Sequence, residues 1–62
     1  MREVRTVGFY ECAVEDVVCG EKHLWEVRNF HGELMTAGLE KTQDLAWVVS
    51  TNVATAYMRT TR

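Results

Sequence analysis

Residues 23–39, HLWEVRNFHGELMTAGL, hold two alternating runs separated by a turn signal. In the first run, residues 23–30, Trp25 and Val27 share one parity and Glu26 and Arg28 share the other, which is the period of a half-buried strand. The letters NFHGE, in which Gly32 suits a tight turn, then lead into an apolar run at 34–39. The stretch therefore predicts an antiparallel hairpin.

A further strand is predicted before this hairpin, over residues 2–15, where β-forming residues dominate and alternate. Both parities are apolar around residues 7–10, so either a bulge switches the faces there or both faces of the sheet are covered. Residues 15–22, EDVVCGEK, supply the following turn, with Gly20 best able to take a positive φ. The first part of the chain thus predicts a three-stranded antiparallel meander.

The final third of the chain predicts a helix that packs on this sheet. Thr42 is a good N-cap, Asp44 falls in the first turn, and Arg59 and Arg62 suit the C-terminal end. A strand from 47 to 57 stays open as the alternative, because Val, Thr and Trp are frequent. The helix reading predicts an α+β fold (β-β-β-α), in which the sheet-facing stripe is Leu45, Val48, Val49, Val53, Ala56 and Tyr57.

The other side of this helix also lacks charge, since residues 45–58, LAWVVSTNVATAYM, contain no charged residue. A surface helix normally places Lys and Glu there. We therefore predict a self-association interface, although exposure of a few apolar residues on a monomer is the simpler alternative. A two-fold homodimer is the commonest arrangement and would supplement a small core. The predicted interface residues are Trp47, Thr51, Ala54 and Met58.

Length and charge restrict the class of protein. The 62 residues form one domain (1–62), and 47% of them are hydrophobic, which is typical of a folded chain. The net charge of −2 provides no broad attraction to nucleic acid. The N-terminus lacks a basic segment followed by an apolar one, and the uncharged stretch is too short to span a bilayer. We expect a cytoplasmic protein with no membrane association.

Residues with catalytic or metal-binding chemistry are few. Cys12, Cys19, His23 and His31 give C-x6-C-x3-H-x7-H, which is not the short cysteine spacing of a zinc finger. Zinc, a disulfide and a Cys12–His23 nucleophile pair remain alternatives to two reduced thiols. We expect no metal, no cofactor and no enzymatic activity.

Acidic residues gather around the first predicted hairpin: Glu11, Glu15, Asp16 and Glu21. One interpretation is a solvated edge that discourages aggregation. The other is a surface that is complementary to a basic partner, such as a nucleic-acid-handling complex. These four residues are therefore candidates for binding an outside protein.

Several motifs resemble those of known β-β-β-α modules. The letters WEV (25–27) and TQDLA (42–46), together with Gly32 and Gly38, resemble the AP2/ERF and integrase N-terminal DNA-binding modules. The span LWEVRNFHGELMTAGLE is similar to the bacterial YegP-like family. The first resemblance implies a sheet whose Arg and Lys read the major groove. The third strand offers no cation here, so we do not expect direct nucleic-acid binding.

The sequence predicts a non-enzymatic interaction protein that forms a homodimer and binds another protein. Its small size and moderate charge resemble accessory proteins of phages and other mobile elements. The most specific expectation is an inhibitor of a host or defence complex, similar to anti-CRISPR proteins. A small DNA-binding regulator of the integrase type is the alternative.

Overall fold

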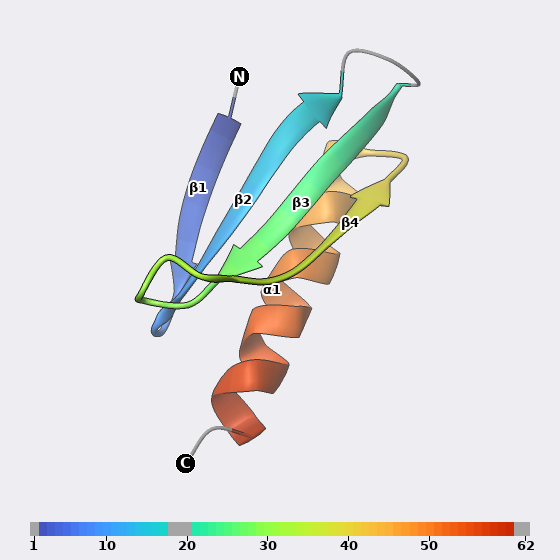
Figure 1. Cartoon of the computed structure of the whole chain (residues 1–62). Coiled ribbons are helices and arrows are strands. Elements are labelled where there is room, and N and C mark those ends of the chain that lie inside the picture. Colours follow the sequence, from blue (N-terminus) through green and yellow to red (C-terminus); the bar gives the residue numbers. More distant parts are fainter. Residues whose placement is uncertain (1, 18–20, 61–62) are drawn as a thin grey trace.

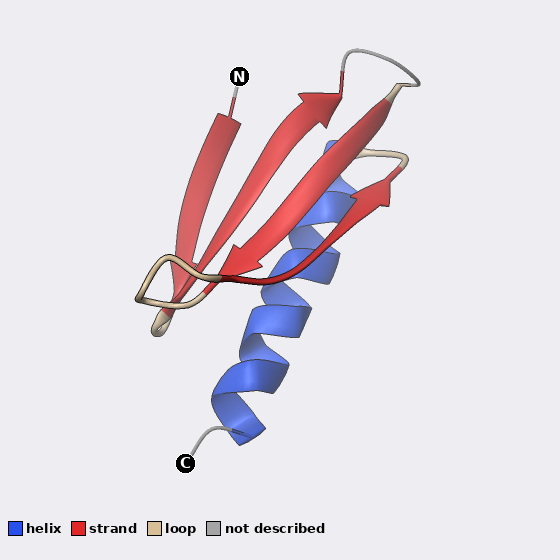
Figure 2. Cartoon of the chain, viewed as in Figure 1, coloured by secondary structure: helices blue, strands red, loops and turns tan. Residues whose placement is uncertain are grey.

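The computed structural model describes residues 2–17 and 21–60 and shows an antiparallel sheet of four strands with one helix on one of its faces (Figures 1 and 2). The α+β class and the C-terminal helix are confirmed, but the prediction of three strands is wrong. The strands lie side by side in chain order. Their bounds are β1 (Arg2–Val7), β2 (Tyr10–Val17), β3 (Lys22–Arg28) and β4 (Leu34–Glu40), and α1 spans Gln43–Thr60.

The additional strand arises because the predicted strand over residues 2–15 turns back on itself at Gly8 and Phe9. Val7 pairs with Tyr10, so the turn between them has two residues. Gly8 has a φ of +59°, which glycine adopts without steric cost, as in a type II′ turn with glycine first. The apolar residues of both parities around this point therefore mark a chain reversal and not a bulge.

Helix α1 begins where the sequence predicts. The Leu45 backbone N–H donates to Thr42 Oγ1 at 3.1 Å, which makes Thr42 the N-cap. Asp44 lies in the first turn and Arg59 in the last, where each charge suits the helix dipole. The alternative strand over 47–57 is wrong. No helix in the described part of the chain is long and apolar enough to cross a membrane.

The core lies between α1 and the central strands β2 and β3. On the helix side it contains small residues four apart, Ala46, Ser50 and Ala54, which are fully buried and let the helix approach the sheet closely. The Cys12 thiol accordingly reaches the Ser50 carbonyl oxygen, and the Ser50 hydroxyl donates to the Trp47 carbonyl. The remaining buried members of the core are Tyr10, Cys12, Val14, Trp25, Val27 and Trp47.

The helix is rotated relative to the predicted orientation. Trp47 is only 7% exposed and belongs to the core, whereas Leu45 and Val48, which were predicted to face the sheet, are 47% and 54% exposed. The prediction that Trp47 and Ala54 lie on the outer face is therefore wrong. The Arg5 guanidinium lies 4.1 Å from the centre of the Trp47 ring and covers it from β1.

In the described part of the chain, no helix lies over the sheet face opposite α1 (Figure 2). Strand alternation and register place Val4, Ala13 and Ala37 on this open face, with Glu26 between the two alanines. Leu24 lies beside Leu39 on the same face. The open face therefore mixes aliphatic and charged side chains.

Candidate interaction site

Two turns bring a pair of phenylalanines together at one end of the sheet. In an antiparallel meander the β1–β2 turn and the β3–β4 loop fall at the same end, and α1 runs back towards it (Figure 1). Phe9 occupies the first turn and Phe30 the second, with ring centroids 6.3 Å apart. They are 73% and 71% exposed, although such large apolar side chains are normally removed from water. An exposed aromatic pair of this kind is typical of a contact surface.

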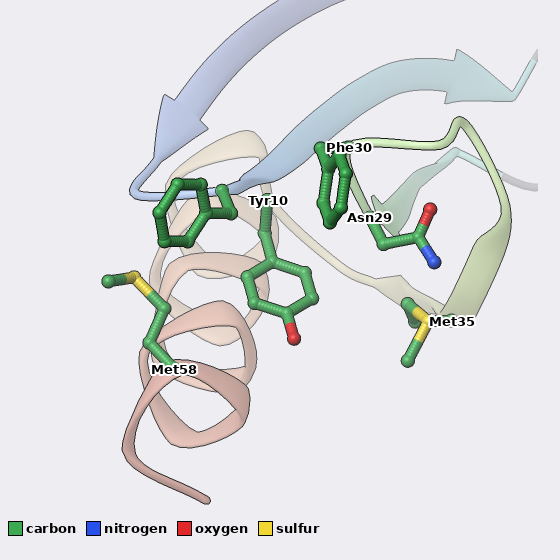
Figure 3. Close-up of a pocket in the computed structure, with 6 residues that line it drawn as sticks. Tyr10, Asn29, Phe30, Met35 and Met58 are labelled. Atoms are coloured by element: carbon green, nitrogen blue, oxygen red, sulfur yellow. The ribbon is translucent and has the colours of Figure 1, made fainter. Parts of the chain in front are cut away.

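The two phenylalanines border a cavity of about 330 Å³, which we call the aromatic–methionine pocket. Tyr10 and Met58 approach it from β2 and the end of α1, and Met35 approaches it from β4 (Figure 3). The Tyr10 ring stacks on Tyr57 with centroids 5.6 Å apart, which fixes this side of the pocket. The lining residues are Phe9, Tyr10, Asn29, Phe30, Met35 and Met58.

Asn29 holds the β3–β4 loop in place. Its Oδ1 accepts hydrogen bonds from the backbone N–H groups of His31 and Glu33, at 2.9 and 3.0 Å. Its Nδ2 donates to Glu33 Oε1, and the loop is closed by backbone bonds from Asn29 to Glu33 and from Gly32 to Asn29. A loop tied by this many bonds presents Phe30 with little conformational entropy left to lose on binding.

The chemistry of the lining indicates the kind of group that fits. None of its six residues is Asp, Glu, Lys, Arg or His, and the Asn29 amide is already engaged within its own loop. Methionine adapts its shape and contacts aromatic rings favourably. The pocket therefore suits an uncharged, apolar group.

The four residues of the predicted self-association interface do not form one surface. Trp47 and Ala54 are core residues, and Thr51 is half-buried with its hydroxyl donating to the Trp47 carbonyl oxygen at 2.7 Å. Met58 is 38% exposed and lines the aromatic–methionine pocket. Of this set, only Met58 belongs to the candidate site.

The four acidic candidates are spread along the sheet. Glu11 and Glu15 are exposed on the open face of β2, opposite Arg28 and Leu24 respectively. Glu21 is exposed near the start of β3, towards the other end of β2 from Glu11. Asp16 lies in β2 opposite His23, and its side chain is outside the described part of the structure.

Arg28, one of the cations on the open face, is engaged locally. The Arg28 guanidinium donates to Glu26 Oε2 at 3.1 Å and to the Gly32 carbonyl oxygen at 3.0 Å. Proteins that read the major groove need several convergent cations, whereas Lys22 and Arg28 lie at opposite ends of β3. The geometry gives no support to the DNA-binding alternative.

The candidate metal ligands lie apart. Cys12 is opposite Val27, His23 is opposite Asp16, and His31 is in the β3–β4 loop. Among the described residues no three of the His, Cys, Asp and Glu side chains come together, and Cys19 lies outside them. Cys12 is a free, buried thiol.

The buried Cys12 thiol is expected to react slowly. Burial raises its pKa, and the Ser50 side chain only partly opposes this, so less reactive thiolate is present at neutral pH. In a Cys19→Ser variant, we expect native Cys12 to react with a disulfide reagent at least about tenfold more slowly than in the denatured chain. Equal rates in the two states would contradict the buried placement.

Comparisons with family models, curated proteins and solved structures found no match to this chain.

Sequence reasoning missed most of the aromatic–methionine pocket. Phe9 directly follows Gly8, and Phe30 lies within the turn signal NFHGE, so both aromatic residues occupy turns that usually carry polar residues. That placement is the local signal that could have identified them. The meeting of the two turns with Met58 depends on the tertiary fold.

Proposed function

We propose that this chain is a non-enzymatic protein-interaction module that holds an apolar side chain of its partner in the aromatic–methionine pocket. The observation that carries the proposal is the exposed Phe9–Phe30 pair beside a cavity of about 330 Å³. Aromatic anchors at the centre of an apolar patch dominate the energetics of protein interfaces. The hydrogen-bonded Asn29 loop and the two-residue β1–β2 turn support the proposal, because they present both rings on a preorganised backbone.

The partner that we propose is a basic host protein, such as a nucleic-acid-handling complex, which the chain inhibits. Its apolar side chain would fill the pocket, while the exposed carboxylates of Glu11 and Glu15 would attract its cations. More specifically, we propose that the chain inhibits a host or defence complex. This step rests on the small size and moderate charge of the chain.

Paired variants test the role of the pocket. Phe9→Ser/Phe30→Ser removes both rings from exposed positions, so the fold should be kept while the affinity for a captured partner falls by at least about 30-fold, or about 2 kcal/mol. The matched control, Leu45→Ser/Val48→Ser, removes exposed apolar surface from the outer side of α1 and should bind like the wild type. Equal binding by all three proteins, measured by titration calorimetry, would refute the pocket as the binding site.

A small-molecule probe tests the pocket without a partner. Indole and toluene mimic apolar side chains, and either should shift the methyl NMR signals of Met35 and Met58, which line the cavity. Benzoate should have a weaker effect because the lining offers no cation to pair with its charge. Unchanged methionine signals with all three probes would show that the cavity does not accept an apolar group.

A further inference from the structure

Two methionines contribute thioether sulfur to the aromatic–methionine pocket. Met35 and Met58 both line the cavity, and Figure 3 shows Met58 on one side of Tyr10 and Met35 on the other. They are 40% and 38% exposed, so small solutes can reach both side chains from solvent. A thioether is apolar and adapts its shape, but peroxides oxidise it to a polar sulfoxide. The pocket is therefore lined by groups whose polarity an oxidant can change.

The Met58 sulfur lies against the β1–β2 turn. A Cβ at Gly8 would overlap Sδ and Cε of Met58, so the end of this side chain fills the space that only glycine leaves at the turn. Phe9 is the next residue of the same turn. The contact therefore joins the end of α1 to the backbone that presents Phe9. An oxygen added to this sulfur has to be accommodated beside that backbone.

Met35 occupies a less regular part of the fold. The register shift at Val27/Arg28 leaves Met35 as the extra residue of the edge strand β4. An extra residue of this kind is not paired in the ladder, and the strand bends there. A sulfoxide at this position can therefore turn towards water without moving the turn that carries Phe9.

We propose that Met58 is a site of oxidation by peroxides, and that its sulfoxide weakens the binding of apolar groups in the aromatic–methionine pocket. The thioether sulfur attacks one oxygen of the peroxide, so an S–O bond forms while the O–O bond breaks. With hydrogen peroxide, the other oxygen leaves as water after it takes up the proton of the transferred oxygen. The sulfur loses two electrons and the peroxide gains them.

The sulfoxide changes both the polarity and the shape of the pocket. The Asn29 amide is engaged within its own loop, so a sulfoxide oxygen that stays inside keeps water that an apolar ligand must displace. A sulfoxide that turns outward withdraws Met58 from Gly8 and removes one wall of the cavity. Either arrangement lowers the affinity for an apolar group. This consequence rests on the proposed function, whereas the oxidation of Met58 and its effect on the Gly8 turn do not.

Treatment of the whole chain with hydrogen peroxide tests the site. Every protein compared carries Cys19→Ser, so the buried Cys12 is the remaining thiol. Peptide mass spectrometry should locate one added oxygen on Met58, and toluene should bind at least about tenfold more weakly after oxidation. Met58→Leu, a swap of similar volume, should keep its toluene affinity within about threefold on the same treatment. The matched control, Met35→Leu, should lose affinity like the parent chain.

The NMR signal of the Gly8 amide reports the oxidation without any ligand. Sulfoxide formation should shift this signal in the parent chain and in Met35→Leu, but not in Met58→Leu. Reduction by methionine sulfoxide reductases should restore both the signal and the toluene affinity. This reversal separates sulfoxide formation from oxidative damage to other residues.

Three results would overturn the inference: Met58 that stays unoxidised while Met35 is oxidised, an oxidised parent chain that keeps its toluene affinity, or a Met58→Leu chain that loses as much affinity as its parent. A parent chain that does not bind toluene before oxidation would instead refute the proposed function. The Gly8 signal would then still decide whether oxidation of Met58 displaces the turn, so the two failures are distinguishable.

Discussion

Trp47→Ala is expected to leave the chain largely unfolded. The Trp47 ring is 7% exposed between α1 and the sheet, with the Arg5 guanidinium against it. Truncation of a buried tryptophan to alanine costs about 3–5 kcal/mol through lost burial and the cavity that remains. At about 0.05–0.15 kcal/mol per residue, a chain of this size has only about 3–9 kcal/mol of unfolding free energy. Urea denaturation followed by far-ultraviolet circular dichroism measures the loss.

Val48→Ala on the outer side of the same helix is the matched control. Val48 is 54% exposed, and alanine has the higher helix propensity, so the unfolding free energy should change by less than about 0.5 kcal/mol. If Trp47→Ala kept the wild-type urea midpoint but lost self-association, Trp47 would belong to an interface and the observed helix orientation would be refuted.

The sequence predicts the existence of α1 but not which side of it is buried. Both sides are apolar, so helical periodicity cannot choose between them. The predicted and observed buried stripes share Val49, Val53 and Tyr57. The side of α1 that is buried is the one whose side chains pack closely against the sheet. Ala46 and Ser50 are small enough to bring the helix backbone close to the strands. Packing of this kind is set by the facing strands and has no local sequence signal.

The number of strands was predictable in principle. Hairpin signals are usually Asn-Gly or Asp-Gly, and the Gly8–Phe9 turn has glycine first and a large aromatic residue second. The change of parity around this turn, which suggests a bulge or a sheet covered on both faces, is equally explained by a chain reversal. The positive φ of Gly8 and the pairing of Val7 with Tyr10 show that the chain reverses here.

The aromatic–methionine pocket could not be predicted from spacing. Its lining comes from positions between Phe9 and Met58, almost the length of the chain. A Cβ at Gly8 would meet the Met58 side chain, so the turn and the end of the helix are in close contact. This proximity follows from the meander topology, which places both turns and the helix end together.

Gly38→Val is expected to destabilise the protein by about 2–3 kcal/mol, as overpacking of a filled site does. A Cβ at this position would lie 2.7–2.9 Å from the Cζ2, Cε2 and Nε1 atoms of Trp25, whose ring lies across the glycine. The ring is buried and its Nε1–H donates to Glu40 Oε2 at 3.3 Å, so any displacement disturbs the core and this bond together. Urea denaturation measures the loss, and near-ultraviolet circular dichroism reports the displaced indole.

Two comparisons separate this clash from a general intolerance of valine in β4. Ala37→Val adds bulk to the exposed open face one residue earlier and should change the unfolding free energy by less than about 0.5 kcal/mol. Gly38→Val in a Trp25→Leu background should cost clearly less than in the wild type, because the atoms that it meets are gone. Equal costs in the two backgrounds would show that the indole is not the obstacle, and that Gly38 is required for its backbone and not for the space that it leaves.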